Sequence, residues 1–211
     1  WLYRGSSPDL GVATRRLSTN LSRWSRHEDD ALFHVMGHLS GTYDLGVTFV
    51  ACPEDWATMP VDMPFDADHG NTPGCTKSTT GFITALRGPS SWAPVDWGTR
   101  GQGSTAVSTP DAETTACRDA TMRSGLPLVM LVERLFRRPV RLQGRGDNTT
   151  SLQFIESGFS RKLSYLRRSQ KVSLGFLHDY ALDEDAQPYK VPTGSQDGDL
   201  LTKGVDDTAH W

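Results

Sequence analysis

The order of the expected elements predicts a mixed α/β fold. After two N-terminal helices, strands with alternating apolar residues come first, and a helix, a strand, a helix and a late strand and helix follow them. The chain has 211 residues, of which 36% are hydrophobic, so it can bury one good core and a small appendage. We therefore predict a mixed five-stranded sheet flanked by helices, with a two-helix extension at the N-terminus.

The N-terminal part of the chain is predicted to form two amphipathic helices. Apolar residues recur at helical spacing after a start signal at Pro8, and the pattern repeats in a second helix. We assign residues 1–46 to this helical extension and residues 47–211 to the main domain. The apolar faces, which include Trp24 and Met36, predict either docking on the main domain or association with another protein.

Alternation of apolar and polar residues marks the expected strands. It is present over residues 45–49 and again over 61–66, where it runs directly into Asp66. The stretch 70–74 contains Gly and Pro and predicts a turn, and residues 78–86 have the pattern of a returning strand. We expect the strands on either side of this turn to pair in antiparallel fashion.

The next segment is expected to contain a third strand and two consecutive helices. A connection rich in Gly, Pro and Ser over residues 87–103 leads to a predicted strand at 104–108. Pro110 suits the first turn of a helix that carries Glu113. Gly and Pro then break or kink this helix, and an apolar helical pattern continues over residues 126–136.

The last part of the chain brings two more acidic residues to the ends of elements. Asp147 follows a short strand, and Asp199 lies at the start of the last helix. The expected elements are a strand at 140–143, helices at 148–155 and 163–182, a strand at 189–191 and a helix that starts at 198. The mixed order of strands and helices supports the predicted fold class.

Positive charge is concentrated in one stretch, although the net charge is −3. Lys and Arg dominate residues 134–171, whereas the part from Asp179 onward is acidic. Such asymmetry is typical of a cationic face that follows a phosphate backbone, and also of an ordinary solvated helix surface. Charge alone leaves both interpretations open.

Four acidic residues are the first candidates for chemistry. They are Asp66, Glu113, Asp147 and Asp199, which are far apart in the chain but are each placed to join one cluster. Hard divalent cations such as Mg²⁺ prefer carboxylate oxygens, and two such ions can act on one phosphate. The pattern therefore favours two-metal hydrolysis of a phosphodiester.

Five short sequence motifs, in the same order along the chain, resemble those of the ribonuclease H domain in copia-type LTR retrotransposon reverse transcriptase polyproteins. They are F-D-A-D at 65–68, T-K-S-T-T-G at 76–81, S-T-P-D-A-E at 108–113, G-D-N at 146–148 and G-D-L-L-T-K at 198–203. The N-terminal helices also resemble the segment that precedes ribonuclease H in these polyproteins, so the similarity covers residues 1–203. The Y-x-D-D word of the polymerase is absent, and no polymerase activity is expected.

The resemblance implies a ribonuclease H-like fold and a metal-dependent endonuclease that cuts the RNA strand of RNA/DNA hybrids. The four acidic residues would bind two Mg²⁺ ions, or Mn²⁺ in their place. The polymerase portion of the parent reverse transcriptase is a further expected partner. Residues expected to contact the nucleic acid are polar or basic and lie near or after the third acidic residue: Arg145, Asn148, Thr149, Arg161, Arg167 and Arg168.

Departures from the family pattern support a second interpretation. His69 replaces the usual Trp after the first acidic pair, and Thr193 stands where many cellular relatives keep a histidine. The alternative is a catalytically inactive, domesticated ribonuclease H-like module that binds nucleic acid or a protein partner. Against it, four clustered carboxylates without a metal would repel one another and lower stability.

Neither a zinc site nor a disulfide framework is predicted. His34 and His38 lie one helical turn apart, but the Glu of H-E-x-x-H and an obvious third ligand are missing. The three cysteines, at 52, 75 and 117, lack disulfide-framework and metal-site spacing, which is typical of a reducing compartment. The cysteine pattern therefore predicts an intracellular protein, cytoplasmic or nuclear. Because no apolar run has the length of a membrane span, no membrane partner is expected.

Overall fold

The computed structural model describes residues 2–70, 76–169, 172–182 and 188–203. Its strands are β1 (Val61–Asp68), β2 (Thr79–Arg87), β3 (Trp92–Gly101), β4 (Leu142–Gly146) and β5 (Tyr189–Lys190). Its α-helices are α1 (Leu2–Gly5), α2 (Gly11–Thr19), α3 (Arg26–Gly41), α4 (Thr109–Ala120), α5 (Leu126–Phe136), α6 (Thr149–Ser157), α7 (Leu166–Ser169) and α8 (Leu174–Leu182). Short 3₁₀ turns are η1 (Pro8–Leu10), η2 (Leu21–Arg23), η3 (Pro53–Asp55), η5 (Thr193–Ser195) and η6 (Asp197–Leu201), and η4 (Thr121–Gly125) is a π-helical turn.

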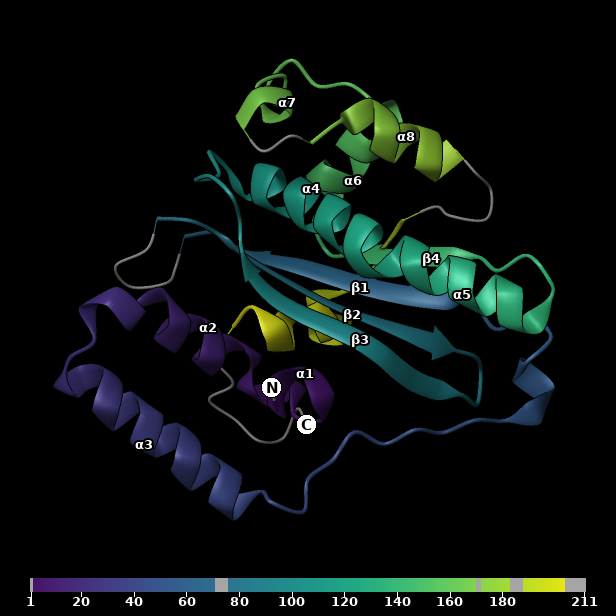
Figure 1. Cartoon of the computed structure of the whole chain (residues 1–211). Helices are drawn as coiled ribbons and strands as arrows, with labels where there is room; N and C mark the ends of the chain where they lie inside the picture. The colour runs from purple at the N-terminus through teal and green to yellow at the C-terminus, as the bar shows by residue number, and fades with distance from the viewer. Residues whose placement is uncertain (1, 71–75, 170–171, 183–187, 204–211) are drawn as a thin grey trace.

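The strands form one mixed sheet in the order β3-β2-β1-β4-β5. β2 runs antiparallel to both β1 and β3, whereas β4 runs parallel to β1 and β5 parallel to β4. Helices lie on both sides of this sheet (Figure 1). The expected α/β fold class, a mixed five-stranded sheet flanked by helices, is confirmed.

The main hydrophobic core lies between the sheet and α4. All eight residues of β1 are buried, and its Phe65 packs in one core with Phe82 of β2. The helix presents Ala112, Ala116 and Ala120, each fully buried, so its backbone can approach the strands closely. Such close packing without voids is what stabilises a small α/β domain.

The N-terminal helices α1 and α2 pack against β3. Trp97 Nε1 donates a hydrogen bond to the Tyr3 carbonyl at 2.6 Å, and the Thr99 amide donates to the Tyr3 hydroxyl. α3 packs on α2 and forms an outer layer (Figure 1). The proposed boundary between residues 46 and 47 stays a prediction.

Two predicted strands are wrong. Residues 45–49 form no strand, and the alternation there ends in a single bridge between Val50 and Trp92. Residues 104–108 are not a strand either, because the third strand is β3, inside the stretch predicted to be a connection. Pro94, Gly98 and other small or polar residues interrupt the apolar alternation of β3, and its apolar contacts come from the helices that cover it.

The other elements follow the sequence closely, with shifted ends. The strands expected at 61–66, 78–86, 140–143 and 189–191 correspond to β1, β2, β4 and β5, and the helix at 126–136 is α5. The helix expected over 163–182 is divided into α7 and α8, since Val172 and Ser173 are not helical. Most of the expected turn at 70–74 lies outside the described residues.

Candidate metal centre

Three carboxylates from separate elements converge beside the central strands. Asp66 lies in β1, Asp147 directly follows β4 and Asp199 lies in η6. One oxygen of each lies within 4.8 Å of one oxygen of the others. The parallel ladder of β1 and β4 runs to Pro64 opposite Arg145, so both strands deliver an aspartate just past this point. The carboxyl ends of parallel strands are a common location for a binding site.

Two glycines allow η6 to lie directly on the sheet. Gly81 of β2 is the ladder partner of Asp66, and a Cβ atom at Gly81 would lie 2.6 Å from the Thr202 side chain. A Cβ atom at Gly198 would lie 3.0 Å from the Asp66 backbone nitrogen. Because neither position has room for a side chain, the turn reaches the strand and brings Asp199 to the first carboxylate.

The fourth predicted acid, Glu113, extends from α4 toward the same cluster. Its side chain is buried, and this burial, together with the charges of Asp66 and Asp147, raises the pKa of its carboxyl to about 9. A hydrogen bond from the Ala67 backbone opposes this shift. The structure therefore places all four predicted acids in one electrostatic group.

Hydroxyl and ammonium groups contact the carboxylates. The Thr202 hydroxyl donates to Asp66 Oδ2, and the Thr193 hydroxyl donates to Asp147 Oδ2 at 3.0 Å. Lys203 Nζ lies 2.9 Å from Asp199 Oδ2. Burial raises the pKa of Asp199 to about 6, although the hydrogen bond with Lys203 acts in the opposite direction.

This donor set fits a hard divalent cation. Glu113 Oε2 and Asp199 Oδ1 are buried and have no hydrogen-bond partner among the described residues. Unpaired buried carboxylate oxygens are costly unless a cation or proton neutralises them. Oxygen ligands without sulfur or imidazole favour Mg²⁺ or Mn²⁺ over zinc. The acidic group could therefore hold a metal ion.

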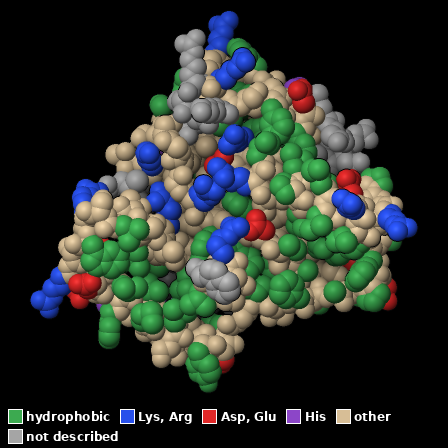
Figure 2. Space-filling view, viewed as in Figure 1, with side chains coloured by type: hydrophobic (Ala, Val, Ile, Leu, Met, Phe, Trp, Pro, Cys, Tyr) green, Lys and Arg blue, Asp and Glu red, His purple; other side chains and the backbone are tan. Residues whose placement is uncertain are grey.

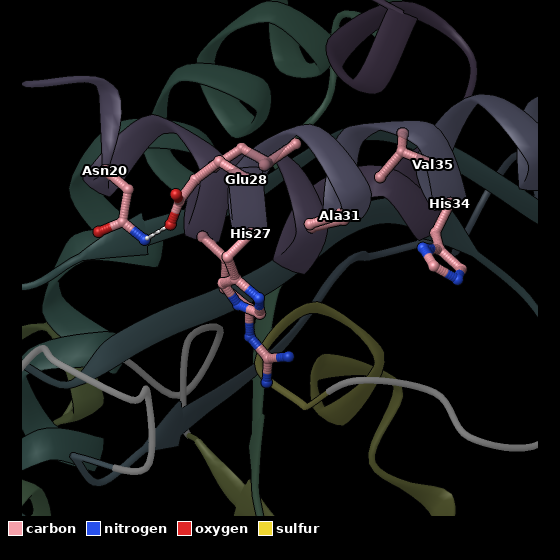
Figure 3. Close-up of a pocket in the computed structure, with 9 residues that line it drawn as sticks. Asn20, His27, Glu28, Ala31, His34 and Val35 are labelled. Carbon is pink, nitrogen blue, oxygen red and sulfur yellow. Dashed lines mark hydrogen bonds between the residues drawn. The ribbon is translucent and has the colours of Figure 1, made fainter. Parts of the chain in front are cut away.

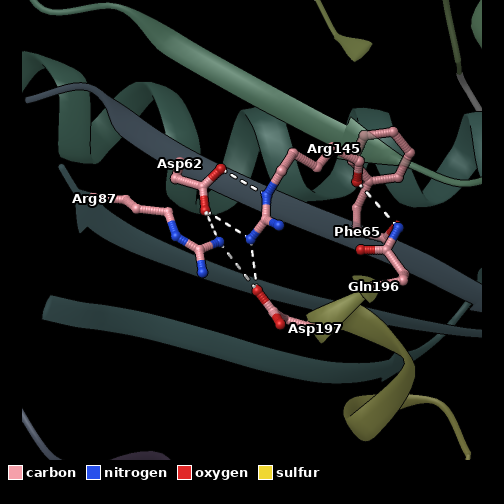
Figure 4. A network of polar contacts seen from close by, with 6 residues as sticks. All are labelled: Asp62, Phe65, Arg87, Arg145, Gln196 and Asp197. Atoms are coloured by element: carbon pink, nitrogen blue, oxygen red, sulfur yellow. Dashed lines mark hydrogen bonds and ion pairs between the residues drawn. The ribbon is translucent and has the colours of Figure 1, made fainter. Parts of the chain in front are cut away.

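A largely buried ion-pair network joins β1, β4 and η6, the elements that carry or precede the three aspartates (Figure 4). Arg145 of β4 donates from Nε to Asp62 Oδ1 at 2.8 Å and from Nη2 to Asp62 Oδ2 at 2.7 Å. The same Nη2 lies 2.5 Å from Asp197 Oδ2. The Arg145 side chain is only 7% exposed, so it has no open face for a phosphate. We therefore correct its predicted role in nucleic-acid contact to a structural one.

Gln196 joins the two strands that carry acids. Its Nε2 donates to the Phe65 carbonyl of β1 at 2.9 Å and to the Arg145 carbonyl of β4 at 3.2 Å (Figure 4). The side chain thus bridges the carbonyls of both strands next to Asp66 and Asp147. Gln196 thus links β1 and β4 just beyond Pro64 and Arg145, the last residues that pair directly in the two strands.

The other residues predicted to contact nucleic acid differ in their placement. Asn148 is the N-cap of α6, and its Oδ1 accepts from the amides of Thr150 and Ser151 at 3.0 and 3.1 Å. Thr149 beside it is exposed, as are Arg161 and Arg167. The side chain of the remaining candidate, Arg168, lies outside the part of the chain that the structure describes.

The basic stretch of the sequence does not form one continuous face. α5 ends at one side of the molecule, whereas α7 lies at the other (Figure 1). Beyond the end of α5, Arg138 donates to the carbonyls of Trp56 and Met59 at 2.7 and 3.1 Å, which is a structural role. Figure 2 shows Lys and Arg in the upper and central part of one face and separately at its right edge.

The histidine pair of α3 does not form a metal site. His38 Nε2 lies 2.6 Å from Asp9 Oδ2, and His34 Nδ1 lies 2.7 Å from the Asp30 carbonyl. Among the described residues, the group of His, Cys, Asp and Glu side chains that could hold a metal is the three aspartates above. No described helix has the length and apolar character needed to cross a bilayer.

A separate cavity of about 380 Å³ lies between α2 and α3 (Figure 3). Its buried Glu28 accepts hydrogen bonds from Asn20 at 3.0 Å and from the Ser25 hydroxyl at 2.5 Å. Ser25 and Glu28 form the capping box of α3. The polar groups of this cavity therefore stabilise a helix start.

Comparisons with known proteins give structural matches alone. No protein-family model matches the chain, and no curated protein matches its sequence. RNase H1 from the halophilic archaeon Halobacterium salinarum NRC-1 is 18% identical, with 66% of this chain and 90% of that chain covered and a TM-score of 0.43. LC11-RNase H1, isolated from compost by a metagenomic approach, is 12% identical, with 67% and 91% covered and a TM-score of 0.46.

Sequence analysis missed the polar residues that support the acids. Asp62 and Asp66 lie on the same face of β1, where a carboxylate inside an apolar strand requires a partner. The basic residue Arg145 of β4, two residues beyond Gln143, the ladder partner of Asp62, was the available signal. Gln196 carried no comparable signal, because a lone Gln in a loop is usually solvated.

Proposed function

We propose that the protein is a metal-dependent endonuclease that hydrolyses the RNA strand of RNA/DNA hybrids. The observation that carries this proposal is the meeting of three aspartates within 4.8 Å, with a buried glutamate beside them. Such a costly concentration of negative charge has little structural benefit and is explained by binding of cations.

The four acids Asp66, Glu113, Asp147 and Asp199 would hold two Mg²⁺ ions, or Mn²⁺ in their place. When bound, these ions activate water for attack on the phosphodiester and stabilise the leaving oxygen. The raised pKa of Glu113 means that this carboxyl must release its proton for ligation, so cation binding is coupled to proton release.

Groups around the acids keep the carboxylates in place for this reaction. The Thr202 and Thr193 hydroxyls each fix one oxygen of an aspartate, which leaves the other oxygen for a cation. Lys203 balances part of the negative charge through Asp199. Such support by neighbouring side chains is typical of metal ligands in general.

The substrate would lie on the exposed residues next to Asp147. Thr149 follows this acid in sequence and can contact a ribose hydroxyl, which distinguishes RNA from DNA. Asn148 orients the start of α6 there. Arg161 and Arg167 can contact phosphates without reading sequence. The five sequence words and the preceding helices also support an origin in a copia-type retroelement.

The experiment is cleavage of a labelled RNA/DNA hybrid in Mg²⁺ and in Mn²⁺. Double-stranded RNA, double-stranded DNA and the Asp147→Asn protein serve as controls. We expect metal-dependent cutting of the hybrid's RNA strand alone, and a loss of at least about 100-fold in Asp147→Asn, the scale of one lost transition-state contact. EDTA should abolish the activity.

A binding module is the second candidate. The Lys203–Asp199 ion pair favours it, because an ammonium already neutralises one carboxylate of the cluster without a metal. The same assay separates the candidates. Hybrid binding without cutting in either metal would replace the nuclease with the binding module, and cutting of all duplexes alike would contradict hybrid specificity.

A further inference from the structure

We infer that the Asp62–Arg145–Asp197 network, of which Asp62 and Arg145 are buried, is a positioning device that sets the spacing of the metal-binding carboxylates. This inference rests on the proposed function, since it concerns the same metal centre. Each member of the network belongs to an element that also delivers one carboxylate. The network thus joins the three carriers of the acids to one another.

Each of the three network residues has one of the three aspartates of the cluster as its counterpart in the same segment of the chain. Asp62 precedes Asp66 on the same face of β1, and Arg145 is followed, two residues later, by Asp147, which comes directly after β4. The third member, Asp197, begins the turn η6, which carries Asp199. A shift of any one network residue would therefore move the adjacent acid in the same direction.

The contacts are short and directional. The guanidinium of Arg145 binds both oxygens of Asp62 through two nitrogens, at 2.8 and 2.7 Å, and reaches Asp197 at 2.5 Å. The Asp62 side chain is 1% exposed and that of Arg145 is 7% exposed. Paired hydrogen bonds between Arg and a carboxylate fix orientation as well as distance. Figure 4 shows the three side chains converging from the two strands and the turn.

The turn η6 depends on such attachments because it is not a strand of the sheet. Its described links to the sheet are the ion pair of Asp197, the Gln196 amide on two strand carbonyls, the Thr202 hydroxyl on Asp66, and the Thr99 hydroxyl on the Leu201 carbonyl at 2.8 Å. Leu201 is fully buried and adds an apolar contact. Of these links, the ion pair of Asp197 is the one that joins two charged side chains, and it lies two residues before Asp199.

Stability alone does not account for the network. Replacement of a buried ion pair by apolar side chains of similar size is often neutral or stabilising. What apolar side chains do not supply is a fixed direction between three separate segments. The network is therefore best explained by the geometry that it imposes on the acids.

Arg87, beside the network, provides a matched control. Its Nη1 contacts the same two carboxylates, Asp62 at 3.1 Å and Asp197 at 3.4 Å, but its side chain is 41% exposed. It also lies in β2, which carries none of the four acids. Loss of Arg87 should thus remove charge from the network without releasing an acid-bearing element.

The experiment compares Arg145→Met, Arg145→Lys, Asp197→Ala and Arg87→Met with the wild type. Mn²⁺ affinity is measured by calorimetry, and kcat and KM on the hybrid are measured separately. We expect Arg145→Met and Asp197→Ala to lower Mn²⁺ affinity by about 10- to 100-fold, as loss of groups that orient metal ligands does. Their kcat should fall similarly while KM for the hybrid changes by less than about 3-fold, because the substrate surface is intact.

The conservative and control variants distinguish positioning from folding. Arg145→Lys keeps the charge without the paired geometry and should recover part of the Mn²⁺ affinity. Arg87→Met should stay within about 2-fold of the wild type. If Arg145→Met does not fold, Asp197→Ala still tests the inference, since it leaves the Asp62–Arg145 pair in place. Wild-type Mn²⁺ affinity and kcat in Asp197→Ala would overturn the inference.

A crystal structure of Asp197→Ala separates this inference from the proposed function. If the wild type binds Mn²⁺ but does not cut the hybrid, the proposed nuclease function is contradicted. The Mn²⁺ affinities of the variants then still test whether the network positions the carboxylates. If the wild type binds no Mn²⁺, the inference is tested by the distance between the Asp66 and Asp199 carboxylates in the Asp197→Ala structure, compared with the wild type. Separation of the two carboxylates supports positioning, and an unchanged spacing overturns it.

Discussion

The two faces of the sheet are built from different chemistry. On the α4 face, buried alanines pack against Phe65 and Phe82 in a large apolar core. On the η6 face, a small apolar cluster that includes Trp97 adjoins the buried charges of Asp62 and Arg145. β1 serves both faces because successive residues of a strand point to opposite sides. One face supplies most of the stability, and the other places the acids.

Glu113 connects these two regions. It is carried by the helix of the apolar face, yet its carboxyl lies in the field of Asp66 and Asp147. Its burial, together with the charges of Asp66 and Asp147, raises its pKa further than that of Asp199, on which Lys203 acts in the opposite direction. The comparison of the two faces therefore makes different predictions for core residues, for Glu113 and for the residues around η6.

The largest effect on stability is expected on the α4 face. Phe65→Ala should lower the free energy of unfolding by about 3–5 kcal/mol, because it leaves a cavity in a close-packed core. Chemical denaturation measures this change. Val95→Ala, at a side chain on β3 that is 48% exposed, should change stability by less than about 0.5 kcal/mol. Equal losses in both variants would contradict the assignment of the core to the α4 face.

The pH dependence of stability tests the link between the faces. In the metal-free protein, Glu113 keeps its proton up to a pH of about 9, whereas in the unfolded chain it loses its proton near its ordinary pKa of 4.5. Its contribution to stability is thus present at low pH and decreases as pH rises from about 4.5 to 9. The decrease is at most about 1.4 kcal/mol per pH unit.

The measurement is the thermal midpoint between pH 5 and pH 9 in EDTA. We expect a steady decline in the wild type and a flatter profile above pH 6 in Glu113→Gln, which stays neutral throughout. Asp199, with its pKa of about 6, should preserve part of the decline at lower pH in both proteins. Parallel profiles over the whole range would show that Glu113 is not buried beside the other acids.

Gly81→Ala is expected to act on the η6 face. The added Cβ would lie 2.6 Å from the Thr202 side chain, so η6 must move, at a cost of about 1–3 kcal/mol. The increase in thermal midpoint on addition of Mn²⁺ should be reduced or lost. Gly37→Ala in α3, where a Cβ meets open space, is the matched control and should stabilise the helix slightly. A normal response to Mn²⁺ in Gly81→Ala would mean that η6 does not need this close approach.

The sequence predicted the α4 face better than the η6 face. The regular spacing of apolar residues in β1, β2 and α5 is a local signal, and each of the four acids lies in a recognisable sequence motif. β3 was missed because Pro94 and Gly98 interrupt its pattern, and its burial comes from the N-terminal helices. The role of Arg145 was misassigned because a basic residue in a sequence does not reveal whether its partner is a phosphate or a buried carboxylate. That choice depends on the long-range pairing of β1, β4 and η6.

The smallest effect is expected at Asn148, which joins the α6 cap to the proposed substrate surface. Asn148→Ala should lower the free energy of unfolding by about 1 kcal/mol, because the amides of Thr150 and Ser151 lose their acceptor. Asn148→Asp keeps an acceptor, so stability should be retained. Its added negative charge, next to Asp147, should instead repel phosphate and raise KM for the hybrid. If Asn148→Asp binds the hybrid as tightly as the wild type, the substrate does not pass over the start of α6, and Asn148 acts on the fold alone.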